Sequence, residues 1–399
     1  MGHLDLLDPV LRYRVDTVTG TVSTSVAGLF RSRAVHRFGA GCVLLHGNPP
    51  PSLRIQPLPP DSADSAAVVE TPNDRVRAVL DRAFSRPELA TTAVVVLHGD
   101  SIIAERYASG YGTMTRLQGW SLKKSVINAV VGILVREGRL DVHQRAPVRA
   151  WSRSGDPRRA ITVDDLLRMT SGLALRETNS GFDPVSRMLY LERDMAAFAE
   201  LAHLEAPPGS EWHYSTGNTV ILGRIIRDAV GGSADDVARF ARAALFAPVG
   251  MRTAVLEFDA TGVPIAMYAS ARDWARFGRL FATDGVVGVQ RILPEGWVTY
   301  STTPTLQSGY GAGWWLGGPS WRPDWRLPSD AFYAAGHLHQ KVLVIPSAGI
   351  VIARFGTTHA PDDGLGVVAQ EVLGALHPHS IASSTPKAVG VNGPRNPFK

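Results

Sequence analysis

Ser121 and Lys124 have the residue types and the spacing of a nucleophile and its general base. On a helix, side chains three positions apart share a face, with Cβ atoms about 5–6 Å apart. The positive end of that helix favours negative charge near Ser121; together with burial and the charge of Lys123, it lowers the pKa of Lys124. A neutral amine beside a hydroxyl activates that hydroxyl for attack on a carbonyl. The pair therefore predicts a serine nucleophile that is activated by a lysine base.

The alternative for this motif is an N-cap serine followed by a solvated lysine. Two observations favour the catalytic interpretation. The chain has only five lysines against 36 arginines, and arginine does not give up its proton in proteins. The segment 121–136 is also apolar almost all round, which predicts a buried helix. Lys123, two positions after the serine, points elsewhere, and the other Ser-x-x-Lys match, Ser384 to Lys387, lies in a proline-containing tail.

Tyr214 is the next candidate. It stands in Tyr214-Ser215-Thr216-Gly217-Asn218, on a predicted loop that enters a helix. A phenol can relay a proton when cations lower its pKa, although an ordinary half-buried tyrosine is the alternative. The aromatic residues Trp120, Trp314 and Trp315 are candidates to line an acyl or aromatic pocket, with core packing as the alternative for the last two.

His337 and His339 lead into a late strand, followed by Gln340. On a strand the two histidines alternate and face opposite sides, and no third ligand is evident, so we expect no metal site. Glycine-rich nucleotide loops and the His-Glu-x-x-His zinc motif are absent from the sequence. We therefore expect a cofactor-independent enzyme.

The elements around these residues predict a mixed α/β (α+β) fold: one antiparallel sheet flanked by helices and interrupted by a mostly helical insertion. We expect an extension and linker over 1–72, a hydrolase domain over 73–378 with its insertion at about 118–270, and a disordered tail over 379–399. Expected strands are 93–97, 101–106, 341–345 and 349–355, and expected helices include 74–84 and 365–376. Two further helices open at Thr162 and Ser270, each followed by aspartate in a capping-box pattern, and end at Gly172 and Gly278.

Composition excludes several classes of protein. Hydrophobic residues make up 45% and charged residues 19%, as in a globular protein rather than a disordered one. The single Cys42 excludes an internal disulfide framework, and the net charge of +5 without a dense basic run argues against a nucleic-acid partner. No apolar stretch is long enough to span a membrane. The first residues carry acids and no apolar export core, which predicts a cytoplasmic protein, or a periplasmic one if the start is truncated. The oligomeric state stays open.

The sequence resembles the serine β-lactamase and penicillin-binding-protein superfamily in three features taken together. They are Ser121-x-x-Lys124, Tyr214 about 90 residues later, and the strand start at Gly336–Gln340. The resemblance covers about 75–377 and is closest to the class C-like branch, which includes family VIII carboxylesterases and 6-aminohexanoate-dimer hydrolases. The segments 166–173, 270–278 and 309–315 add to it. It implies that Ser121 is acylated, that Lys124 is its base, and that Tyr214 moves protons to the leaving group and from water. It also implies an oxyanion hole made of the backbone N–H groups of Ser121 and Gln340.

Two departures from the family pattern bear on substrate. Lactamases of this branch carry Tyr-x-Asn, whereas Thr216 stands at the third position, and they carry Lys-Thr-Gly where His337-Leu338-His339 stands here. Both favour an esterase or amidase acting on a small-molecule substrate over a β-lactam hydrolase. A peptidase of the D-amino-acid or penicillin-recognising kind is one alternative. Because His339 replaces a glycine that lets substrate approach, a non-catalytic binding protein on the same fold is a second.

Overall fold

The structure is a computed structural model that describes residues 11–26, 30–45, 55, 58–59, 67–178 and 180–377. Its centre is a six-stranded sheet in the order β12-β13-β14-β15-β5-β6, in which every neighbouring pair is antiparallel. The strands are β5 (Thr91–His98), β6 (Ser101–Tyr107), β12 (Trp315–Leu316), β13 (Phe332–Gly336), β14 (Gln340–Ile345) and β15 (Ile350–Gly356). Because β15 pairs with β5, the early and late strands form one sheet, as expected.

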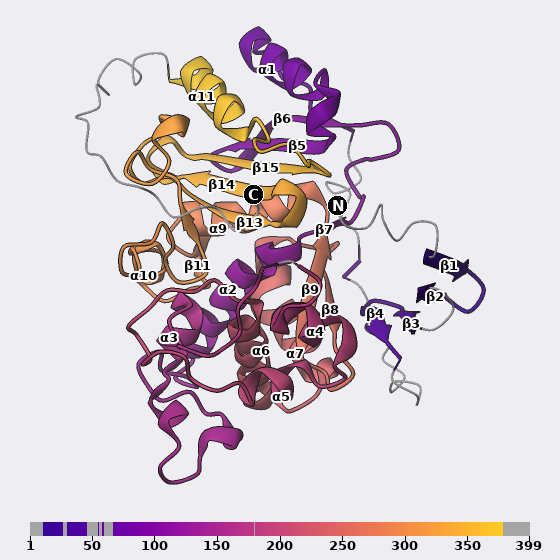
Figure 1. Ribbon diagram of the computed structural model, residues 1–399. Helices are drawn as coiled ribbons and strands as arrows, with labels where there is room; N and C mark the ends of the chain where they lie inside the picture. Colours follow the sequence, from indigo (N-terminus) through magenta and orange to yellow (C-terminus); the bar gives the residue numbers. More distant parts are fainter. Residues whose placement is uncertain are drawn as a thin grey trace.

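Helices cover both faces of this sheet (Figure 1). Helices α1 (Asp74–Phe84) and α11 (Leu365–Leu376) pack on one face, and α9 (Ala271–Ala282) packs on the other. Successive side chains of a strand point to opposite faces, so β5 places Val94 and Val96 in the cluster under α1 and α11. Val95 and Leu97 belong to the larger cluster on the opposite face. Burial on both faces explains why β5 is a continuous apolar run rather than an alternating one.

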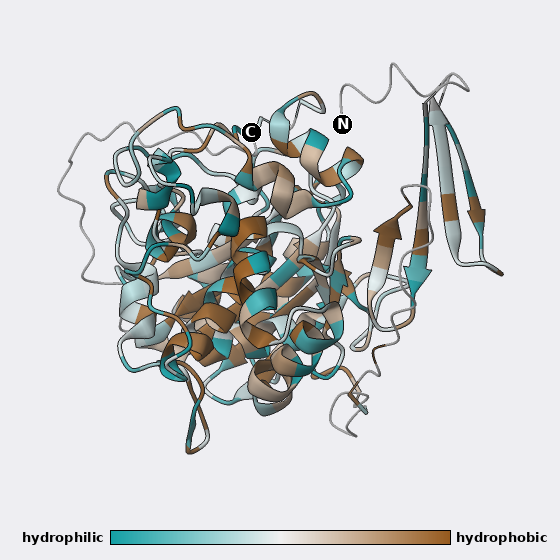
Figure 2. Ribbon diagram, turned by 90° about the horizontal axis from the view of Figure 1, so that it is seen from below, coloured by the Kyte–Doolittle hydropathy of each residue, from teal (hydrophilic) through white to brown (hydrophobic). Residues whose placement is uncertain are grey.

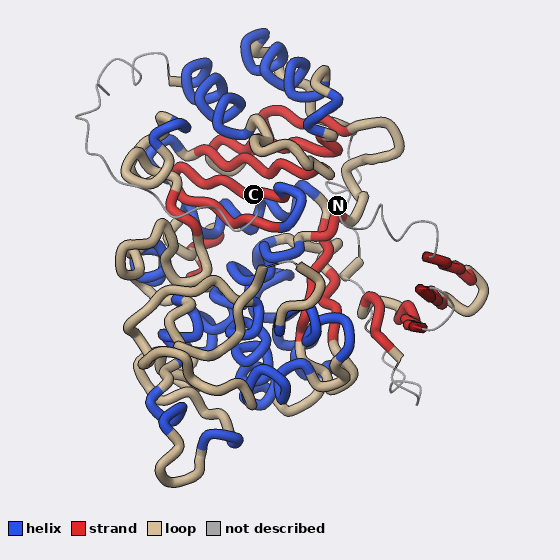
Figure 3. Tube along the Cα trace, viewed as in Figure 1, coloured by secondary structure: helices blue, strands red, loops and turns tan. Residues whose placement is uncertain are grey.

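Most of the chain between β6 and β13 forms the helical part, drawn mainly blue and tan in Figure 3. At its centre is α2 (Lys123–Arg136), which is buried over its first twelve residues. Around it lie α3 (Val163–Arg168), α4 (Pro184–Leu191), α5 (Met195–Glu200), α6 (Thr216–Val230), α7 (Ala234–Ala241), α8 (Ala247–Val249) and α10 (Trp297–Thr302). Short strands complete it: β7 (Leu117–Gln118), β8 (Val255–Phe258) and β9 (Pro264–Ala269) in the order β7-β9-β8, and the pair β10 (Val286–Val287) and β11 (Gln290–Arg291).

Two predicted helix ends are wrong. The helix capped by Thr162 ends at Arg168, because Met169 takes a left-handed conformation with φ 65°. Gly172 has a different role: a Cβ there would lie 2.0 Å from the carbonyl oxygen of Ala206, so only glycine permits this approach. The helix capped by Ser270 continues through Gly278 to Ala282. A Cβ at Gly278 would lie 2.6 Å from Val351, so this glycine allows α9 to pack closely on the sheet.

The N-terminal residues fold into a sheet that the sequence analysis did not predict. Strands β1 (Leu11–Asp16), β2 (Thr21–Val26), β3 (Phe30–Arg37) and β4 (Gly41–Leu44) form an antiparallel meander. It is joined to the rest of the protein through β8: the Arg37 guanidinium donates to the carbonyl of Phe258 at 2.9 Å, and the backbone N–H of Cys42 donates to Glu257 at 3.1 Å. Most of the expected linker and the expected tail lie outside the described residues.

Apolar residues concentrate inside the main body, where Figure 2 shows brown segments on the central helices and strands. No helix in the described part of the chain has the length and apolar character needed to cross a membrane.

Candidate active site

Ser121 lies at the entrance to the buried helix α2. Strand β7 leads into a short 3-10 turn (Trp120–Leu122) that continues directly into the helix. Trp120 has φ 51°, a left-handed conformation that costs a residue with a side chain about 1–3 kcal/mol. Ser121 stays partly exposed while every residue from Leu122 to Leu134 is buried. This turn thus places the hydroxyl of Ser121 at the edge of the core.

Lys124 is 3% exposed and its Nζ lies 2.9 Å from the Oγ of Ser121 and 2.8 Å from the Oγ1 of Thr216. Burial lowers the pKa of Lys124 from 10.5 to about 8, and the charge of Glu177 opposes that change. The direction agrees with the sequence analysis, although burial is the largest cause. A lysine with this pKa is neutral in a useful fraction of molecules near neutral pH, as a general base must be.

Tyr214 lies beside the same amine: Nζ of Lys124 is 4.4 Å from the centre of the phenol ring. The expected direction of its pKa is wrong. Burial raises the pKa of Tyr214 well above its usual value, Glu177 and Tyr310 add to the rise, and a hydrogen bond with Ser121 opposes it. Tyr214 is therefore a neutral phenol that can relay a proton by accepting one hydrogen bond and donating another, rather than a tyrosinate base.

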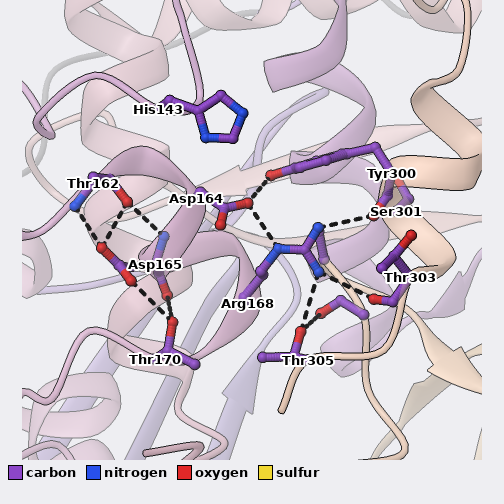
Figure 4. A network of polar contacts seen from close by, with 12 residues as sticks. His143, Thr162, Asp164, Asp165, Arg168, Thr170, Tyr300, Ser301, Thr303 and Thr305 are labelled. Carbon is purple, nitrogen blue, oxygen red and sulfur yellow. Dashed lines mark hydrogen bonds and ion pairs between the residues drawn. The ribbon is translucent and has the colours of Figure 1, made fainter. Parts of the chain in front are cut away.

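The loop that carries Tyr214 rests on the end of α3. The backbone N–H of His213 donates to the carbonyl of Met169 at 3.0 Å, and the hydroxyl of Ser171 donates to Asn218 on α6 at 2.7 Å. Below it, Arg168 pairs with Asp164 at 2.8 Å and donates to the carbonyl of Tyr300 at 3.0 Å (Figure 4). Arg168 thereby ties α3 to α10. The segment that the sequence analysis noted at 166–173 is thus the support for the tyrosine loop.

Glu177 is a residue that the sequence analysis missed. Its carboxylate accepts a hydrogen bond of 2.6 Å from the backbone N–H of Thr216, at the start of α6. Thr216 in turn contacts Lys124, so Glu177 both positions the threonine and brings a negative charge toward the amine. It stands in a loop with no periodic pattern, and nothing in the sequence distinguishes it from the other acidic residues.

Lys123 is buried as well, with 5% exposure, and its ammonium donates to the backbone carbonyl of Ile265 on β9. Burial and the charge of Lys124 lower its pKa to about 7. Its partner lies on β9, whereas the contacts of Lys124 are Ser121 and Thr216. This agrees with the expectation that Lys123 points away from the serine.

The residues that join β13 to β14 have a different conformation from the one expected. His337 and His339 are not on a strand but in a 3-10 turn that joins β13 to β14, with Leu338 and His339 in left-handed conformations. Gly336 fits tightly against the segment before the serine, since a Cβ there would lie 2.2 Å from the carbonyl oxygen of Gly119. The exposed ring of His337 contacts Trp120, with ring centres 5.3 Å apart.

The side chains of His339 and Gln340 contact groups on the neighbouring backbone and on the loop that contains Asp363. Nδ1 of His339 lies 3.1 Å from the carboxylate of Asp363, which also pairs with Lys341. The side chain of Gln340 donates to the carbonyls of His337 and Leu338, both at 3.2 Å, and to that of Gly356. Gln340 thus closes the hairpin with its side chain while its backbone begins β14.

The aromatic candidates divide into two groups. Trp314 is fully buried and stacks on Phe277 in the core, with ring centres 5.9 Å apart, so its assignment to a pocket wall is wrong. Trp315 is partly exposed and packs against Tyr214 and Tyr310, at 5.6 and 5.0 Å between ring centres. With Trp212, these rings form an aromatic wall beside Tyr214. Although Trp314 and Trp315 are adjacent in the sequence, the first lies in the core and the second lies in the aromatic wall.

Comparisons with known proteins identify the family of the chain. Residues 76–375 match the family model described as Beta-lactamase. The chain is 28% identical over 268 residues to the 6-aminohexanoate-dimer hydrolase of Paenarthrobacter ureafaciens, which covers 61% of this chain and 67% of that protein.

The fold is shared with solved structures, among them the following two. A penicillin-binding protein homologue from Caulobacter crescentus has a TM-score of 0.63 at 16% identity and covers 78% of this chain and 99% of its own. A family VIII carboxylesterase has a TM-score of 0.60 at 15% identity and covers 77% of this chain and 98% of its own. The family match spans three quarters of the sequence, and the chain therefore belongs to the β-lactamase family, as a serine hydrolase.

Proposed function

We propose that this enzyme hydrolyses carboxylic esters or small amides through an acyl intermediate on Ser121. The observation that carries the proposal is the 2.9 Å contact between a buried lysine amine and the hydroxyl of a partly exposed serine. A second acceptor at 2.8 Å, the hydroxyl of Thr216, fixes the direction of the amine. The relative named 6-aminohexanoate-dimer hydrolase and the carboxylesterase of the same fold support this substrate class.

The reaction begins when neutral Lys124 accepts the proton of Ser121 Oγ and the oxygen attacks the carbonyl carbon of the substrate. Negative charge develops on the carbonyl oxygen. The backbone N–H of Ser121, at the positive end of α2, stabilises it. A second N–H comes from the hairpin turn His337–Gln340, which Gly336 allows to pack against Gly119. The resemblance to the family implies that this second donor is the backbone N–H of Gln340, the first residue of β14.

The tetrahedral intermediate then collapses: the bond to the alcohol or amine breaks, and the leaving group takes a proton through the hydroxyl of Tyr214. Water next attacks the acyl carbon, giving its proton back through the same groups, and the Ser121 oxygen leaves as a hydroxyl. Tyr214 suits this relay because its side chain forms a hydrogen bond with Ser121 and its ring lies beside the amine of Lys124. No step requires a cofactor.

The aromatic wall of Trp212, Tyr310 and Trp315 gives the acyl or leaving group an apolar surface beside Tyr214. The departures at Thr216 and at His337–His339 favour esters and open-chain amides over β-lactams. A peptidase that recognises D-amino acids or penicillin is the alternative activity. Membership of a hydrolase family argues against the non-catalytic alternative.

The test is hydrolysis of p-nitrophenyl acetate and butyrate by the wild type, Ser121→Ala and Lys124→Ala. We expect each substitution to lower kcat by on the order of 10⁴-fold or more, because the two groups act as one unit. The second Ser-x-x-Lys motif supplies a matched control, Ser384→Ala with Lys387→Ala, which should keep full activity. Activity that survives Ser121→Ala would contradict the proposal. A stable mass increase with a β-lactam, in place of ester turnover, would favour the peptidase.

A further inference from the structure

The N-terminal sheet holds most of the net charge of the protein. Residues 11–44 contain five arginines and one acid, Asp16, a difference of +4 in a chain whose net charge is +5. The remaining residues are therefore almost neutral. Such a local excess acts on partners, because the field of a compact basic surface extends over about a Debye length, roughly 8–10 Å in physiological salt.

Strand register collects four of these arginines on one face. Arg12 pairs with Ser25 across β1 and β2, and Ser25 pairs with Arg31 across β2 and β3. In the next row of the same face, Arg14 pairs with Ser23 and Ser23 with Arg33. Two residues along a strand span roughly 7 Å and two strand spacings roughly 10 Å, so the four charges form a flat rectangle of about that size. Small serines separate the two columns. We call Arg12, Arg14, Arg31 and Arg33 the arginine face.

One acid, Asp16, lies near the arginine face: hydrogen bonds from Thr19 and, in smaller part, the charge of Arg14 lower the pKa of its carboxyl group. All four side chains are exposed, and none has an ion pair with another residue in the part of the chain that the structure describes. The nearby Asp16 carboxylate accepts from the backbone N–H groups of its own turn, Val18 at 2.9 Å and Thr19 at 3.1 Å. The strands carrying these arginines project from the side of the main body (Figures 1 and 2). Four like charges at these spacings repel one another, and an anionic partner would relieve that repulsion.

Two exposed apolar side chains adjoin one end of this sheet. Val18, in the β1–β2 turn, is 95% exposed, and Phe38, in the β3–β4 turn, is 59% exposed. Both turns lie at the same end, since alternate connections of a meander share an end and the N–H of His36 bonds to the carbonyl of Gly20. A flat basic face bordered by apolar tips is the pattern of a surface that rests on anionic lipid headgroups.

We propose that the arginine face docks this hydrolase onto an anionic phospholipid bilayer. The two-dimensional spread of charge matches a plane of phosphates, and the serine hydroxyls between the arginines add donors to phosphate oxygens. A single-stranded nucleic acid fits less well, because such sites use aromatic side chains among the basic ones and this face has none. The proposal does not depend on the chemistry at Ser121.

The experiment is co-sedimentation of the full chain with phosphatidylcholine vesicles, with and without phosphatidylglycerol, at low and high salt. The variant replaces all four arginines with glutamine: Arg12→Gln, Arg14→Gln, Arg31→Gln and Arg33→Gln. Each arginine near an anionic surface contributes about a fivefold change in affinity, so the variant should bind on the order of several hundred-fold more weakly. The matched control removes four exposed arginines elsewhere: Arg75→Gln, Arg153→Gln, Arg159→Gln and Arg193→Gln.

We expect the wild type and the control to bind only the vesicles that contain phosphatidylglycerol, and high salt to release both. The arginine-face variant should stay in the supernatant while its circular dichroism spectrum and its thermal unfolding midpoint match those of the wild type, which shows that it is folded. Three results would overturn the proposal: no binding by the wild type, equal weakening in the control, or tighter binding of the arginine face to duplex DNA than to the vesicles.

Discussion

The lowered pKa of Lys124 predicts how kcat/KM changes with pH. Nζ is buried and 2.9 Å from Ser121, and burial lowers its pKa from 10.5 to about 8, a destabilisation of the ammonium by ~3 kcal/mol. Only the neutral amine accepts the serine proton, so kcat/KM rises with pH. About one molecule in ten is neutral at about pH 7 and about nine in ten at about pH 9, which gives a tenfold rise and then a plateau.

An unperturbed lysine would behave differently. With its pKa at 10.5, the rise over the same interval would be about a hundredfold, with no plateau. The assay is kcat/KM for p-nitrophenyl butyrate at constant ionic strength, corrected for spontaneous hydrolysis. A profile that is flat between about pH 7 and about pH 9, or one that climbs a hundredfold, would refute the reasoning.

Glu177→Gln tests the electrostatic part of the same argument. The carboxylate favours the charged ammonium and so holds the pKa of Lys124 up, while its oxygen accepts from Thr216. Glutamine keeps an acceptor oxygen and removes the charge, so the rising limb should move to lower pH. The exposed Glu295→Gln, with the same loss of charge, is the control and should leave the limb in place. Movement of the limb to higher pH in Glu177→Gln would refute the assignment.

Three other substitutions test neighbouring parts of the structure. Thr216→Val removes a buried hydrogen-bond partner and should lower kcat about 5- to 30-fold with little change in KM, whereas Thr216→Ser should restore it; an unchanged kcat in the valine variant would contradict this. Tyr214→Phe should lower kcat about 10²–10⁴-fold in steady-state assays without loss of stability, and a near-normal rate would remove the phenol from the mechanism. Arg272→Met leaves the buried Glu105 without its ion pair and should lower the free energy of unfolding by ~3–5 kcal/mol in urea titration, against a negligible change for the exposed Arg75→Met; equal losses would refute it.

The sequence was sufficient for the elements whose signals are local. The β-branched run 93–97, the apolar segment 121–136 and the closing helix 365–376 all form as expected, because continuous burial leaves a continuous apolar pattern. Lys124 could be singled out because a buried amine three residues after a serine has few structural reasons to exist. Its contact with the serine needs only one turn of helix, so no long-range folding information was required.

Features that depend on distant segments could not be predicted. Gly278 has the appearance of a helix stop, but its role is set by Val351, which is far along the chain. Trp314 and Trp315 are indistinguishable in sequence, and only packing sends one into the core and the other to the aromatic wall. Glu177 reaches the site through a loop. The N-terminal sheet did leave a signal, since Arg12-x-Arg14 and Arg31-x-Arg33 have the period of two that is typical of strands.

The most direct test of the central claim is to trap the acyl-enzyme. The wild type is mixed with p-nitrophenyl butyrate and the reaction is quenched in acid during turnover. The mass of the intact protein is then measured by mass spectrometry, and proteolysis with peptide mapping locates any adduct. We predict a mass increase of one butyryl group on the peptide that contains Ser121, and none in Ser121→Ala. A butyryl group on any other residue, or an adduct that persists in Ser121→Ala, would contradict the account.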